Sequence, residues 1–178
     1  MKKTFIYLLL LVAFITVSCK KEVSLQSYLV ESQDKKGFVN FNIPTNLFEL
    51  SVDKSSEDDK KILASIHKIN ITGLPYKTSD EVTYEIEKEK LKAILKSSDY
   101  KKLINFKEEN MHVSFYYSGK ADAIDEIIAF GYGKEKGVGI ARILGDKMNI
   151  TKIMEMLQNA KLNSDNLDFE KFSSLFGI

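Results

Sequence analysis

Apolar residues in the first half of the chain repeat mainly at the three- and four-residue spacing of helices. Residues 23–33 form the first such segment. Capping-box spacing, a Ser or Thr three positions before an acidic residue, predicts two further helices, at Ser56 with Asp59 and at Thr78 with Glu81. The apolar positions on these predicted helix faces are Leu25, Tyr28 and Leu29, then Ile62, Leu63, Ile66 and Ile69, and finally Tyr84, Leu91, Ile94 and Leu95.

Shorter segments separate these helices. Residues 39–43 alternate apolar and polar positions, which predicts a half-buried strand, and residues 70–76 read as a second strand. We expect one helical turn over residues 45–50 and a short helix over residues 99–106.

The second half of the chain contains its most strand-like block, in which Val113, Phe115 and Tyr117 alternate with Ser114 and Tyr116. Residues 113–117, 126–132 and 138–144 follow one another with short turns at 119–122 and 134–137. Consecutive strands joined by such turns form an antiparallel meander.

A last helix and an aromatic tail follow the meander. Asn149 is a suitable N-cap residue for the helix. Its predicted buried face consists of Ile150, Ile153, Met154, Leu157 and Ala160, and the tail carries Phe169, Phe172 and Phe176 at helical spacing.

This order of elements predicts an α+β fold. Helices cluster early, strands cluster late, and no regular βαβ alternation occurs. We expect a two-layer domain over residues 25–161, with a mainly antiparallel sheet of about four strands and helices packed on one face. Residues 162–178 would form a C-terminal amphipathic tail.

The N-terminus has the pattern of an export signal. Lys2 and Lys3 precede a 13-residue apolar run over residues 5–17, too short for a membrane-spanning helix of about 20 residues. Small residues then lead to Cys19, the single cysteine. This resembles a bacterial lipobox, although Thr16 stands where leucine is most frequent. We expect residues 1–18 to be a lipoprotein signal peptide; an ordinary signal peptide or an uncleaved anchor are the alternatives.

Lipidation of Cys19 would attach the domain to a membrane. One acyl chain binds reversibly, whereas the two or three of a lipoprotein anchor stably. Residues 19–24 would be the tether. We expect a cell-envelope protein on the outer membrane. Charged runs that direct lipoproteins to the cell surface usually carry two acidic residues, and the run Lys20-Lys21-Glu22 after the cysteine carries one, so the periplasmic face is favoured over the cell surface.

Composition argues against nucleic-acid binding and against sites that depend on a free thiol. Without Lys2 and Lys3, 24 basic residues face 25 acidic ones, so the mature chain is near neutral and we expect no nucleic-acid partner. Acylation of Cys19 would leave no thiol for a disulfide, a zinc site or a nucleophile.

The glycine series from Gly131 to Gly139 does not fit a nucleotide site. Gly131, Gly133, Gly137 and Gly139 lack G-x-G-x-x-G spacing, and a strand follows them instead of a helix. They predict a hairpin whose turn is residues 134–137.

Catalytic and metal-binding groups are sparse. No carboxylate or second histidine lies three or four positions after His67 or His112. The clusters Glu57–Asp59 and Asp122–Glu126 contain carboxylates suited to acid–base work or calcium, but helix N-termini and turns also explain them. We expect no catalytic residue, metal or cofactor.

Phe115, Tyr116 and Tyr117 place rings on both faces of one strand. Either both faces are covered, by helices or by the tail, or one face presents aromatics to a ligand or partner.

Several segments resemble one family. They are Phe41-Asn42-Ile43-Pro44, residues 65–69, residues 91–96 and residues 141–149. With the lipobox, they are similar to the Bacteroidetes lipoproteins grouped as domain of unknown function 4252, over roughly residues 25–160. The resemblance implies an envelope lipoprotein domain and supplies no catalytic residue.

Two functions remain open. The first is a non-catalytic, lipid-anchored domain that binds an envelope protein or ligand, or serves an envelope response. The alternative is an envelope hydrolase that uses clustered carboxylates, for which Asp122, Asp125 or His112 would have to share a deep polar pocket.

Overall fold

The computed structural model describes residues 23–43 and 57–153, apart from residues 98 and 109. In chain order, its elements are α2 (Leu25–Gln33), β1 (Val39–Ile43), α4 (Glu57–Ala64), β2 (Ile66–Pro75), the 3-10 turn η2 (Tyr76–Thr78), α5 (Glu81–Ser97), β3 (Lys101–Glu108), β4 (Met111–Lys120), β5 (Ala123–Gly133) and β6 (Gly137–Met148).

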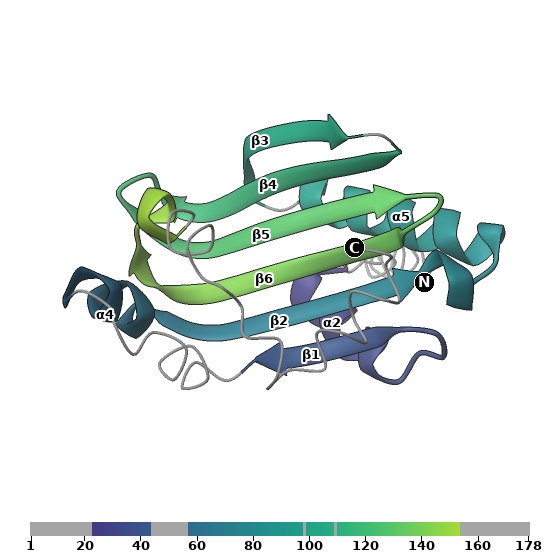
Figure 1. The fold of residues 1–178 in the computed structure, drawn as a ribbon, viewed down its shortest axis with the longest axis horizontal. Helices are drawn as coiled ribbons and strands as arrows, with labels where there is room; N and C mark the ends of the chain where they lie inside the picture. The colour runs from purple at the N-terminus through teal and green to yellow at the C-terminus, as the bar shows by residue number, and fades with distance from the viewer. Residues whose placement is uncertain (1–22, 44–56, 98, 109, 154–178) are drawn as a thin grey trace, which may run out of the picture.

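Six strands of the described chain form one antiparallel sheet in the order β1-β2-β6-β5-β4-β3 (Figure 1). Strands β3 to β6 are a continuous meander, and β6 then pairs with β2, whose other neighbour is β1. The α+β class, the antiparallel sheet and the predicted meander are confirmed. The expected number of about four strands was too low.

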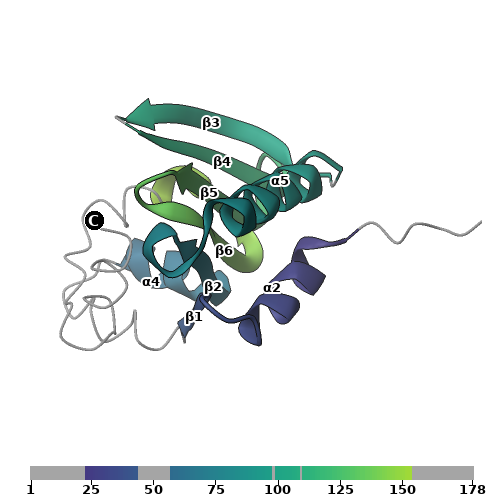
Figure 2. The same cartoon turned by 90° about the vertical axis from the view of Figure 1, so that its right-hand side faces the viewer.

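Helices α2 and α5 cover one face of the sheet (Figure 2). The hydroxyl of Ser24 accepts a hydrogen bond from the Ser27 amide at the start of α2, and the Asp80 carboxylate accepts one from the Thr83 amide at the start of α5. The residues buried between this helix pair and the sheet are Leu25, Tyr28, Leu29, Leu74, Tyr84, Leu91, Ile94, Leu95, Ile128, Phe130, Val138 and Ile140.

A second apolar cluster lies on the opposite face of the sheet, because its strand residues alternate with those under α2 and α5. We call it the isoleucine cluster; it consists of Ile62, Ile66, Ile69, Ile124, Ile127, Met148 and Ile153. Helix α4 contributes Ile62 to it. Helices therefore pack on both faces, and the prediction that they occupy one face was wrong.

Two helix predictions fail at β-bulges. Residues 99–106 were predicted as a helix but include most of β3, and Ile66 and Ile69 were predicted on a helix but lie in β2. The register shifts between Lys102 and Ile104 and between Ile66 and Lys68. A bulge inserts one residue, so positions three apart face the same side of a strand and mimic helical spacing.

The end caps were predicted in part. Asp80, not Thr78, caps α5; the Thr78 hydroxyl instead donates to the carbonyl oxygen of Gly37 at 3.0 Å. The Asn149 cap is confirmed, because its side chain accepts a hydrogen bond from the Lys152 amide at 3.1 Å. Outside the described residues lie Cys19, the turn over residues 45–50, the Ser56 cap, and the predicted buried positions Met154, Leu157 and Ala160 with the tail 162–178.

Candidate functional site: a trough on the sheet

The face opposite α2 and α5 contains a row of small residues across its central strands. Gly73 on β2 lies opposite Gly139 on β6, which lies opposite Gly131 on β5. In the next row, Ala141 on β6 lies opposite Ala129 on β5. Because these positions carry one methyl group or none, the surface of the sheet is hollowed there.

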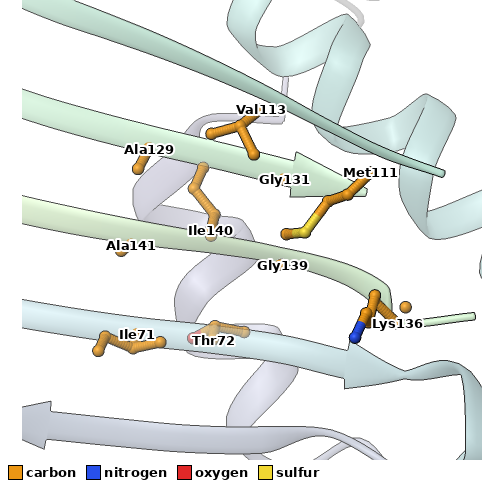
Figure 3. Close-up of a pocket in the computed structure, with 11 residues that line it drawn as sticks. Ile71, Thr72, Met111, Val113, Ala129, Gly131, Lys136, Gly139, Ile140 and Ala141 are labelled. Atoms are coloured by element: carbon orange, nitrogen blue, oxygen red, sulfur yellow. The ribbon is translucent and has the colours of Figure 1, made fainter. Parts of the chain in front are cut away.

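We call this hollow the trough, and Figure 3 shows the residues that line it. Its volume is about 170 Å³. Gly131, Gly139, Ala129 and Ala141 form its floor. Its sides are Ile71 on β2 and, on β4, Met111 and Val113, while Lys136 lies at the end near the β5–β6 turn. The lining is almost entirely apolar, which suits an apolar occupant.

The trough continues into an exposed apolar strip toward the β3 edge. Phe115 on β4 stacks on Phe106 on β3, with ring centroids 6.3 Å apart. Ile104 lies opposite Phe115 and is 55% exposed, and Phe106 is 45% exposed. At the other end, Ile127 and Ile69 of the isoleucine cluster limit the trough.

The glycine series does form the predicted hairpin. Gly133 lies opposite Gly137, and the amide of Lys136 donates to the carbonyl oxygen of Gly133 at 3.1 Å. Gly137 has a φ of +119°, a conformation that strongly favours glycine. The hairpin prediction is thus confirmed.

The three aromatic residues of β4 divide between the two faces. Tyr116 packs against the core under α5, Tyr117 packs against the isoleucine cluster, and Phe115 lies in the exposed strip. Tyr116 and Tyr117 are thus covered in part on opposite faces of the strand, and the ring of Phe115 lies beside the trough.

A buried polar network lies on the other face, beneath α2. Arg142 donates from Nε to Oε1 of Glu126 at 2.5 Å and from Nη1 to Oε1 of Gln26 at 2.5 Å. The Tyr100 hydroxyl donates to Glu126 at 3.2 Å, and the Ser118 hydroxyl lies 3.5 Å from its other oxygen. Burial, followed by the charge of Glu126, raises the pKa of Tyr100 to about 12. Since its oxygens accept hydrogen bonds from these partners, Glu126 joins β5 to the neighbouring strands and to Tyr100.

The candidate catalytic groups do not come together. Asp122 and Asp125 are exposed at the β4–β5 turn, while Glu126 points into the buried network. His112 lies at the other end of β4, about 20 Å from the strand position opposite Glu126. There it stacks on Tyr132, with ring centroids 4.9 Å apart. The geometry required for the hydrolase alternative is therefore not found at these residues.

The remaining polar candidates have local partners. His67 Nε2 lies 3.0 Å from Asp146 on the exposed surface. In the Glu57–Asp59 cluster, Glu57 pairs with Lys60 at 2.8 Å and Asp58 with Lys152 at 3.3 Å. Among the described residues, no group of three or more His, Cys, Asp or Glu side chains is placed to hold a metal ion.

A second buried carboxylate lies between α2 and α5. Glu87 accepts a hydrogen bond from Lys35 Nζ at 2.8 Å and is 6% exposed. Burial, followed by the charge of Glu87, raises the pKa of Tyr28 well above its usual value. This group lies inside the helix layer, on the far side of the sheet from the trough.

Sequence reasoning missed the trough, although a signal for it exists. Small residues recur at every second position, at Ala129, Gly131 and Gly133 and again at Gly137, Gly139 and Ala141. On paired strands this period places all of them on one face. The proposed lipidation residue, Cys19, lies outside the described residues.

None of the helices in the part of the chain that the structure describes is long and apolar enough to cross a membrane. Comparison with curated proteins and with solved structures gave no match in either case. Residues 28–156, well over half of the sequence, match the model of the family described as Domain of unknown function (DUF4252). The chain therefore belongs to this family.

Proposed function

We propose that this chain is a non-catalytic binding domain of the bacterial cell envelope, anchored through a lipid on Cys19, and that the trough and the adjoining strip of β3 and β4 form its binding surface. The observation that carries the proposal is the apolar hollow of about 170 Å³ on the sheet face opposite α2 and α5. Exposed contiguous apolar surface of this kind commonly marks an interaction site.

The chemistry of the trough supports binding over catalysis. General acid–base work needs a titratable side chain within hydrogen-bond reach of the reacting atom. The one titratable side chain that lines the trough is Lys136, at its end, and the rest of the lining is aliphatic side chains, methionine, glycine and a threonine. An occupant would therefore be held mainly by apolar burial, at roughly 25 cal/mol per Å².

The position of the anchor also fits this role. Residues 19–24 separate Cys19 from the first residue of α2 and span at most about 20 Å when fully extended. A lipid on Cys19 would thus hold the sheet close to the membrane surface, and a partner in the same envelope layer would meet it at a high local concentration.

The anchor is tested by membrane fractionation and intact-mass measurement on the native chain, on Cys19→Ala and on Lys20→Ala, which leaves the cysteine in place. We expect the native and Lys20→Ala proteins in the membrane fraction, with a diacylglyceryl-modified mass that begins at residue 19. Cys19→Ala should lose both. An unmodified native protein, or one cleaved elsewhere, would contradict the anchor.

The binding surface is tested separately with a photoreactive amino acid in living cells. Val113 on the wall of the trough is one position, and Val82, 68% exposed on α5, is the matched control. We expect a reproducible cross-linked species from position 113 and none from position 82. Equal labelling from both positions would argue against the trough as a specific site.

A further inference from the structure

The chain leaves the described part of the structure on the same face as the trough. Asn149 caps a new helical turn, in which the Ile153 amide donates to the Asn149 carbonyl oxygen at 3.0 Å. Ile153 is fully buried in the isoleucine cluster, which borders the trough. The described part of the chain therefore ends on the same face of the sheet as the trough.

The following segment is long enough to cover the trough. Ile143, which packs against the isoleucine cluster, and Gly139, on the trough floor, are four residues apart on β6, or about 13 Å. The 25 residues that follow Ile153 span about 37 Å as a helix and about 80 Å when extended. The segment is therefore long enough to reach the trough in either conformation.

The size and chemistry of the trough match an aromatic ring. An apolar cavity of roughly 150 Å³ accommodates a benzene molecule, and the trough measures about 170 Å³. The segment carries Phe169, Phe172 and Phe176 at i, i+3 and i+7, which is the spacing of one apolar helix face. A floor made of glycine and alanine allows a large side chain to approach the backbone of the sheet closely.

We propose that residues 163–178 dock on the trough of their own chain through this phenylalanine face, as an intramolecular cover. A tethered segment competes at an effective concentration in the millimolar range, which favours it over a second copy of the chain in dilute solution. An envelope partner that uses the same surface must then displace the segment. The cover is independent of the lipid anchor, so either proposal can fail alone.

The test is cysteine cross-linking in the otherwise full chain. Cys19→Ala removes the only cysteine and provides a cysteine-free background. Ala141→Cys on the trough floor is combined with Phe172→Cys. In the control pair, Ala93→Cys on the exposed side of α5 replaces Ala141→Cys. A short bis-maleimide is added, and products are separated by mass into monomer and dimer.

We expect the trough pair to cross-link within one chain at least about tenfold faster than the control pair, because docking holds the two thiols together. A cross-linked dimer would identify a second copy as the occupant and overturn the proposal. Equal rates for the two pairs would also overturn it.

A second measurement protects the test against a variant that fails to fold. Two proteins are compared in the Cys19→Ala background. One carries Ala141→Cys, and the other carries Ala141→Cys together with Phe169→Ser, Phe172→Ser and Phe176→Ser. Circular dichroism first checks that each is folded, and the rate of alkylation of the thiol at position 141 is then measured. We expect the alkylation rate to rise about tenfold when the phenylalanine face is removed, because the thiol at position 141 is then exposed without prior release of the docked segment. An unchanged rate in a folded protein would overturn the proposal.

Discussion

Arg142 on β6 donates to Glu126 on β5 across 2.5 Å, and both side chains are about nine-tenths buried. This ion pair, with Gln26 of α2 and Tyr100 before β3, joins the helix layer to the centre of the sheet. A buried ion pair adds little stability when compared with apolar residues of similar size, but removal of one partner leaves the other charge buried without a partner.

We therefore expect Arg142→Met to lower the free energy of unfolding by about 3 kcal/mol. Tyr100 and Ser118 remain as donors to Glu126, which limits the loss. The double variant Glu126→Met with Arg142→Met should recover most of it. Urea denaturation of the wild type, both single variants and the double variant measures this. A double variant no more stable than the worse single variant would show that packing, not the stranded charge, sets the cost.

The two floor glycines should respond differently to an added methyl group. A Cβ on Gly139 would lie 3.1 Å from the Thr72 carbonyl oxygen and 3.3 Å from the Gly73 Cα, both backbone atoms that cannot move alone. A Cβ on Gly131 would meet the terminal Cε of Met111 at 3.1 Å, and that side chain can rotate away.

Gly139→Ala should thus destabilise by about 1 kcal/mol or more, whereas Gly131→Ala should be near neutral, because alanine also loses less backbone entropy on folding. Thermal unfolding of the two variants side by side compares them directly. Equal losses would mean that Met111 is held in place more firmly than its contacts indicate.

Acid should weaken the start of α5. The hydrogen bond from the Thr83 amide, then that from the Thr83 hydroxyl, lowers the pKa of Asp80. A carboxylate with a lowered folded-state pKa stabilises the fold above its unfolded pKa of about 4, and that stabilisation is lost as the pH falls through the folded value.

An asparagine side chain at this position would cap the helix without titrating, so Asp80→Asn should flatten this part of the acid dependence. The measurement is the unfolding midpoint of both proteins between neutral pH and about pH 2. Parallel curves for the two proteins would show that other carboxylates account for the loss of stability at low pH.

Alkali should weaken the contact between Tyr100 and the sheet. The pKa of Tyr100 is raised to about 12, first by burial and then by Glu126. In the unfolded chain it ionises near pH 10, so the raised value stabilises the fold below pH 10 and this contribution is lost as the pH rises toward 12.

Titration of tyrosine absorbance should therefore show one fewer late-ionising group in Tyr100→Phe than in the wild type. The alkaline decline in stability should also be shallower in the variant. The control is Tyr132→Phe, because Tyr132 lies at the opposite end of β5 from Glu126, the partner of Tyr100. An identical late phase in wild type and Tyr100→Phe would contradict the assignment.

The sequence predicted the fold where spacing is regular and failed where it is interrupted. The strands predicted over residues 113–117, 126–132 and 138–144 lie within β4, β5 and β6, and β1 was predicted with its observed bounds. Ile66 with Ile69, and Ile124 with Ile127, face the same side of the sheet at a spacing of three because the register shifts between them. Such a spacing cannot be distinguished from a helix without knowledge of the partner strand.

The candidate sites, like the secondary structure, could be predicted only where the signal is local in the sequence. That Cys19 stands alone after an apolar run can be read directly from the sequence, because the signal is local. The pairing of Glu126 with Arg142, and the alignment of Gly73, Gly139 and Gly131, depend on which strands become neighbours and in what register. The small residues at every second position indicated the face, but the pairing of β2 with β6 is needed to assemble the trough.

The strand order also determines when the sheet can be completed during synthesis. β2 is made early but its inner neighbour is β6, the last strand in the described part of the chain, and paired residues such as Ile71 and Ala141 lie about 70 positions apart. The antiparallel pair of β1 and β2 must therefore wait, with the other edge of β2 unpaired, until almost the whole domain has emerged. Under the proposed lipid anchor, and with export from the N-terminus, Cys19 would reach the modifying enzymes before the sheet closes, so that the domain would finish folding already attached to its membrane.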